Sequence, residues 1–105
     1  MTDPSAHAAD LTFRPSKGRT LGVEWDLGLL DPVTLDLVSR ADELLVLANS
    51  SEAESHTRPT RSRSTVTKEL LRNTVEIVTG VCANAEQSRA DLADGLGRVQ
   101  AAASE

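Results

Sequence analysis

Hydrophobic and polar residues alternate along the segment LGVEWDLGL, residues 21–29. Its odd positions carry apolar side chains, whereas its even positions carry Gly, Glu, Asp and Gly. Because successive side chains of a strand point to opposite faces, this alternation predicts a β-strand with one apolar face. Asp31-Pro32-Val33-Thr34 is typical of a turn, and the apolar residues within 35–38 predict a second strand that closes a hairpin.

Two segments show the spacing of amphipathic helices. In Arg40–Asn49 the apolar residues recur three and four apart, and Ser39 is expected to cap the helix. A final helix is predicted to open at Asn84, with Gln87 as its capping-box partner. Its apolar face is formed by Leu92, Leu96 and Val99. Gly95 and Gly97 are each expected to weaken this helix by up to about 1 kcal/mol relative to alanine.

Other segments carry little apolar periodicity. Residues 1–18 are predicted to be a disordered lead-in to a domain that spans 19–105. Residues 50–65 are rich in Ser, Thr and charge, which predicts a disordered loop inside that domain. Order is expected to return at Val66, and the β-branched residues at the end of Glu69–Val81 favour another strand. The pattern as a whole predicts an α+β fold, with a partial antiparallel sheet of about three strands and two helices.

Composition limits the possible functions. The chain has 105 residues, of which 39% are hydrophobic, so it has room for one small domain. The arginines within residues 58–63 are the ones that could bind nucleic acid or another anion. The formal net charge of −5 opposes nucleic-acid binding by the chain as a whole. Cys82 is the only cysteine and is expected to be a small buried residue, in keeping with a reducing compartment. With neither a signal peptide nor a long apolar run, the sequence predicts a soluble cytoplasmic protein without membrane contact.

The candidate chemistry lies in three acids. Glu24 and Asp26 would share one face of the first strand, between Gly22 and Gly28. If the strand that contains Glu76 pairs near the first, all three carboxylates could converge on one sheet face. Oxygen ligands of this kind suit Mg²⁺ or Mn²⁺. On spacing alone, however, a solvated polar face is the more common explanation.

Two longer stretches resemble a known family. RTLGVEWDLGLLDPVTLDLVSRADELL and the later KELLRNTVEIVTGVCANAEQSRADL are similar to the start of bacterial carboxylate–amine ligases of the glutamate–cysteine ligase type 2 family. The family's first motif is G-[VI]-E-x-E, and its second is E-L-[LQ]-x-x-[TV]-V-E-[IL]-x-[TS]-G. Asp26 stands where the family has Glu, which sets its carboxylate one methylene further back.

The resemblance implies a glutamine-synthetase-like catalytic fold, a curved antiparallel sheet whose concave face holds metal ions and ATP. It also implies an ATP-dependent ligase that joins a carboxylate and an amine, nominally of glutamate and cysteine, through an acyl phosphate. Glu24, Asp26 and Glu76 then become expected ligands of Mg²⁺ or Mn²⁺. The physical logic agrees, because a divalent cation neutralises phosphate charge during phosphoryl transfer.

Family members are several times longer than this chain, so we expect a truncated ligase domain that is inactive alone. The alternative is a non-catalytic interaction module. Its unfinished sheet would leave open strand edges, through which copies of the chain could self-associate.

Overall fold

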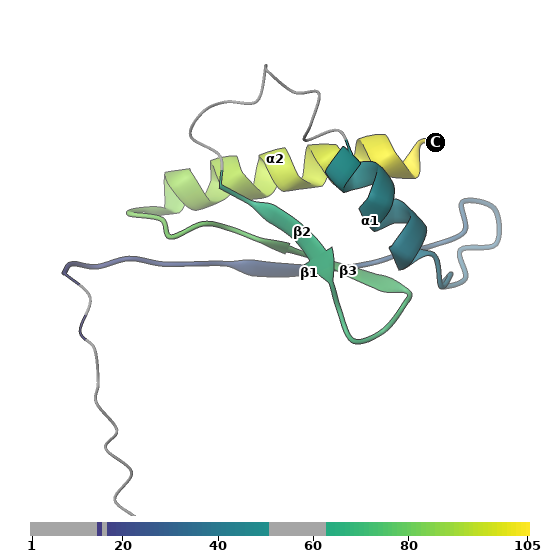
Figure 1. Cartoon of the computed structure of the whole chain (residues 1–105), viewed down its shortest axis with the longest axis horizontal. Coiled ribbons are helices and arrows are strands. Elements are labelled where there is room, and N and C mark those ends of the chain that lie inside the picture. Colours follow the sequence, from purple (N-terminus) through teal and green to yellow (C-terminus); the bar gives the residue numbers. More distant parts are fainter. Residues whose placement is uncertain (1–14, 16, 51–62) are drawn as a thin grey trace, which may run out of the picture.

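A computed structural model describes Pro15, residues 17–50 and residues 63–105 (Figure 1). The elements in chain order are β1 (Glu24–Gly28), α1 (Ala41–Ser50), β2 (Thr65–Lys68), β3 (Thr74–Val78) and α2 (Ala85–Ala103). The strands form one antiparallel three-stranded sheet in the order β1-β3-β2. The predicted α+β class, with three strands and two helices, is therefore confirmed. Neither described helix combines the length and apolar character that crossing a membrane requires.

The register separates the two faces of the sheet. Ile77 in the central strand lies opposite Trp25 on one side and Val66 on the other. Glu76, the next residue along, lies opposite Asp26 and Thr67. Because side chains alternate, the apolar row and the acidic row face in opposite directions.

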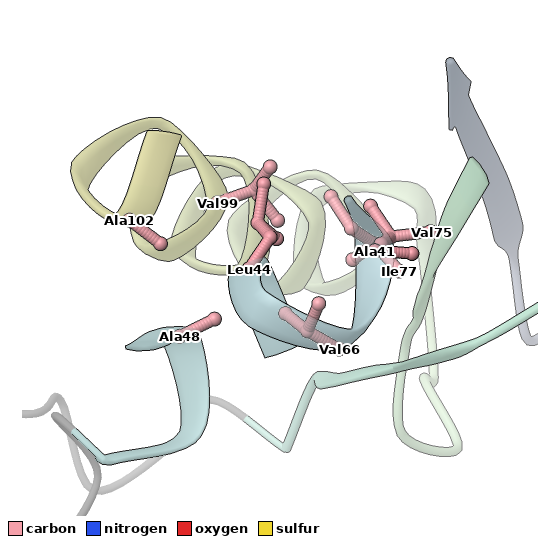
Figure 2. Packing of buried hydrophobic residues seen from close by; sticks show 8 residues of the cluster. All are labelled: Ala41, Leu44, Ala48, Val66, Val75, Ile77, Val99 and Ala102. Atoms are coloured by element: carbon pink, nitrogen blue, oxygen red, sulfur yellow. The ribbon is translucent and has the colours of Figure 1, made fainter. Parts of the chain in front are cut away.

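Both helices pack on the apolar face. Val66, Val75 and Ile77 of the sheet form one cluster with buried residues of α1 and α2. Figure 2 labels the helical members, which are Ala41, Leu44, Ala48, Val99 and Ala102. Val75 and Ile77 are fully buried, so the central strand is the middle of the core. The helices pack over β2 and β3, whereas Trp25 on the same face of β1 remains 41% exposed.

The predicted second strand at 35–38 is wrong. Leu30 and Leu37 form only an isolated bridge, supported by hydrogen bonds from the Asp31 N–H to the Asp36 carbonyl and from the Val38 N–H to the Leu29 carbonyl. Leu35 has a φ of 62°, a left-handed backbone conformation that interrupts an extended strand. The turn itself is as predicted, because Asp31 Oδ1 accepts from the Val33 and Thr34 N–H groups at 2.8 and 2.9 Å.

Several boundaries also differ from the prediction. The first strand is shorter than 21–29, and α1 begins at Ala41, so Arg40 rather than Ser39 precedes it. Ser50 ends α1 and Thr65 starts β2, so the ends of the predicted loop at 50–65 belong to regular elements. Residues 51–62 of that loop, and residues 1–14 and 16 of the predicted lead-in, lie outside the described residues. The strand expected from the β-branched residues at the end of 69–81 is present as β3, and a turn precedes it.

Helix α2 is positioned by polar contacts at its start and in its first half. Asn84 caps it as predicted, with its Oδ1 accepting from the Gln87 N–H at 2.9 Å, while Gln87 Oε1 accepts from the Ala83 N–H. Asp91, only 5% exposed, accepts from the Gly80 N–H at 2.9 Å and from the Arg63 N–H at 3.3 Å. These bonds tie α2 to the end of β3 and to the approach to β2. Cys82 is buried nearby, as predicted.

Candidate metal centre

The acidic face of the sheet carries Asp26 and Glu76 side by side. They are directly opposite each other in the β1–β3 register, so strand pairing itself holds their carboxylates close together. Like charges in such a pair repel unless a cation lies between them. The sheet therefore brings together two of the three acids that the sequence singled out.

A third carboxylate comes from Glu69, which was not among the predicted ligands. Glu69 directly follows β2, in the turn that leads to β3. One carboxylate oxygen from each of Asp26, Glu69 and Glu76 lies within 4.8 Å of the others. The antiparallel pairing of β2 with β3 returns Glu69 to the same face. The sequence does contain a sign of its importance. Glu69 is the first residue of the second family motif, whose later Val-Glu pair is Val75-Glu76.

Glu24 lies beside this group of three acids. It lies two residues before Asp26 on the same face of β1, opposite Val78, and is not part of the group of three. Its charge nevertheless acts on the site, because it contributes to the raised pKa values of both Glu76 and Asp26. The structure thus has a three-carboxylate group with a fourth acid beside it.

The electrostatics of the group favour a positive ligand. Partial desolvation, followed by the charges of Glu24 and Glu69, raises the pKa of Glu76 above its ordinary range. Desolvation and then the Glu69 carboxylate raise the pKa of Asp26 in the same way. Among the described residues, none of the three acids is in an ion pair; the arginines Arg40, Arg89 and Arg98 pair elsewhere.

The donor set fits a hard divalent cation. An octahedral Mg²⁺ with oxygen at about 2.1 Å places adjacent ligand oxygens about 3 Å apart and opposite ones about 4.2 Å apart. In the group, one carboxylate oxygen of each acid lies within 4.8 Å of the others, close to the larger of these separations. Three carboxylates leave further positions for water or phosphate oxygens, which is the usual arrangement for Mg²⁺. The absence of nitrogen or sulfur donors in the group argues against zinc.

The described residues thus form an α+β sheet with both helices on one face and the carboxylate group on the other. Comparison with known families makes the relationship specific. The chain belongs to the glutamate–cysteine ligase family 2, whose family model matches residues 20–105.

Curated relatives agree with this assignment. A protein of Corynebacterium glutamicum (strain R), named "Putative glutamate--cysteine ligase 2", is 39% identical over 93 residues, 89% of this chain and 22% of its own length. Similarly named proteins of Corynebacterium efficiens and Mycolicibacterium vanbaalenii are 38% and 43% identical, over 90% and 82% of this chain. The match covers 23% and 20% of those two relatives, so the chain spans less than a quarter of their length.

Proposed function

We propose that this chain supplies part of the metal- and ATP-binding face of a carboxylate–amine ligase of the glutamate–cysteine type. Such a ligase uses ATP to convert a carboxylate to an acyl phosphate, which an amine then attacks to form an amide. Membership in the family supports the class of reaction. The observation that carries the proposal is the convergence of Asp26, Glu69 and Glu76 on the face of the sheet that the helices leave open.

In the proposed site, the carboxylates of Asp26, Glu69 and Glu76 hold Mg²⁺ or Mn²⁺. The bound ion would supply positive charge to the phosphates of ATP, which lowers the cost of charge that develops during phosphoryl transfer. Glu24, also named by the family resemblance as a ligand, adds negative charge beside Glu76. Thr67 lies opposite Glu76 in β2 and offers a hydroxyl on the same face.

The sheet acts as the rigid support of this site. Asp26 and Glu76 are fixed relative to each other by backbone pairing, and the fully buried Val75 and Ile77 hold their strand against the helices. Ligands on paired strands are positioned more precisely than ligands on loops. We propose that the chain has no ligase activity alone, because more than three quarters of each relative lies outside the match. The contacts to glutamate and cysteine would come from that remainder.

Thermal unfolding with and without Mg²⁺ and ATP tests the proposal. A ligand present at about 100 times its dissociation constant stabilises the folded state by roughly 2.7 kcal/mol. We expect Mg²⁺ with ATP to raise the melting temperature of the wild-type chain, and we expect no rise in Glu76→Gln. Asp36→Asn is the matched control, because it also removes one carboxylate but lies outside the group. An unchanged melting temperature in the wild-type chain, or an equal rise in Glu76→Gln, contradicts the proposal.

A second candidate function is self-association without catalysis. Within the described residues, β1 and β2 each pair only with β3, so both outer edges of the sheet are open to another strand. This function predicts oligomers that form in the absence of metal, which sedimentation at several protein concentrations would detect. A monomer at all concentrations, together with metal binding, would leave the ligase proposal as the better one.

A further inference from the structure

An apolar groove lies on the side of the sheet opposite the acids. Segment 27–32, helix α1 and the last turns of α2 enclose a hollow of about 420 Å³. Its apolar wall is formed by Leu27, Leu29, Leu30, Leu44, Leu47 and Val99. Among the charged residues at the groove, Arg40 and Glu43 already pair with each other at 2.6 Å. Two further acids, Asp31 and Glu105, also line it, and Asp31 Oδ1 accepts from the Val33 and Thr34 N–H groups.

Large apolar side chains around this groove remain in contact with water. Leu30 is 52% exposed and Leu47 is 37% exposed, and Leu37, bridged to Leu30, is 60% exposed. The helices leave Trp25 partly uncovered on the same side of the sheet. Exposed leucines that line one hollow are typical of a surface that another polypeptide covers.

The lengths of the relatives indicate what covers it. They share this chain's sequence over about a fifth of their length, and the other part of each is more than three times as long. We propose that the groove receives an apolar segment from the remaining part of a glutamate–cysteine ligase 2 chain. The segment presents aliphatic side chains to the wall formed by the groove's leucines and Val99.

This docking goes beyond the proposed function and rests only on the family membership and the groove. The acids of the metal centre lie on the opposite face, so a segment seated in the groove leaves them accessible. The groove and the metal centre can therefore be tested separately. Loss of one leaves the other intact.

Thiol labelling tests the proposal through two neighbouring positions of α1. Leu47 lines the groove, whereas Val46, which is 69% exposed, does not. Each is replaced by cysteine, as Leu47→Cys and Val46→Cys, and Cys82 adds little background because it is 2% exposed. The labelling rate is measured in this chain alone and in a chimera. In the chimera, residues 20–105 replace the matching segment of the C. glutamicum relative.

The proposal predicts that Leu47→Cys reacts at least about tenfold more slowly in the chimera than in the isolated chain, since covered sites react only when they open. Val46→Cys should react at similar rates in both. Equal labelling of Leu47→Cys in the two proteins overturns the proposal, as does a chimera that fails to fold. Concentration-dependent protection of Leu47→Cys in the isolated chain also overturns it, because a second copy would then occupy the groove. Mg²⁺ binding by the isolated chain, measured in parallel, reports on the metal centre alone.

Discussion

Two glycines in α2, separated by one residue, should respond differently to the same substitution. A Cβ added to Gly95 would collide with Ile77 Cγ2, and it would also lie 3.5 Å from Ser64 Oγ. A Cβ added to Gly97 would have no atom within 4 Å. Both residues are inside the helix Ala85–Ala103, so both substitutions have the same effect on helix propensity. The two variants therefore differ in packing against the sheet.

The change in the free energy of unfolding has two contributions, helix propensity and packing against the sheet. Glycine in a helix interior is about 1 kcal/mol less favourable than alanine, so Gly97→Ala should stabilise the fold by about that amount. Gly95→Ala gains the same term but forces an extra methyl group against a fully buried side chain, which typically costs about 1–3 kcal/mol. Ile77 is fully buried, so its side chain can yield only by moving against other core residues. The free energies of unfolding of the two variants should thus differ by about 1–3 kcal/mol.

Urea denaturation followed by circular dichroism measures this difference directly. In thermal unfolding, each kcal/mol corresponds to roughly 4–8 °C for a domain of this size. We expect a higher midpoint than wild type for Gly97→Ala and a lower midpoint for Gly95→Ala than for Gly97→Ala. Equal stabilisation by both substitutions would refute the close contact between α2 and β3, and with it the two-layer packing.

Three further predictions concern the cap, the buried acid and the acidic face. Asn84→Ala should destabilise the chain by about 1 kcal/mol in urea denaturation, because the Gln87 N–H loses its acceptor, whereas Asn84→Asp should retain most of the stability. Asp91→Ala should cost about 1–3 kcal/mol in the same assay, since it leaves the Gly80 N–H without its acceptor; a neutral result would show that water replaces the carboxylate. Asp26→Asn should raise the urea midpoint at pH 7 without metal but not at pH 3. The folded-state pKa of Asp26 is raised, so its ionisation opposes folding above that pKa and the effect disappears on protonation. A lower midpoint at pH 7 would contradict this sign.

Local patterns in the sequence predicted some elements well. The alternation around Trp25 gave the correct faces of β1, since Trp25 lies opposite Ile77 and Asp26 opposite Glu76. The Asn84 cap was also predictable, because it depends on residues three apart. Strand β2 was missed because Val66 is its only apolar residue and Thr and Lys surround it. Its burial comes from contacts with distant residues, which no local pattern contains.

The candidate site was predictable only in part for the same reason. The sequence placed Glu24 and Asp26 on one face, and Glu76 with them only if its strand paired near the first. Glu69 reaches the group through the β2–β3 reversal, and β2 was not predicted. Gly95 is a similar case. Sequence alone assigned it a cost in helix propensity, whereas the structure gives it a role in the close approach of α2 to Ile77. Both effects depend on which segments meet in space.

The most direct test of the central claim is a titration of the metal-free chain with Mn²⁺, followed by electron paramagnetic resonance of the free ion. The account predicts one binding site that weakens at least about tenfold in Glu69→Gln, because one of three charged ligands is lost. Glu24→Gln, which removes a neighbouring charge, should weaken binding less, and Asp36→Asn should leave it unchanged. Binding in Glu69→Gln equal to that in Asp36→Asn would contradict the claim that Asp26, Glu69 and Glu76 form the metal centre.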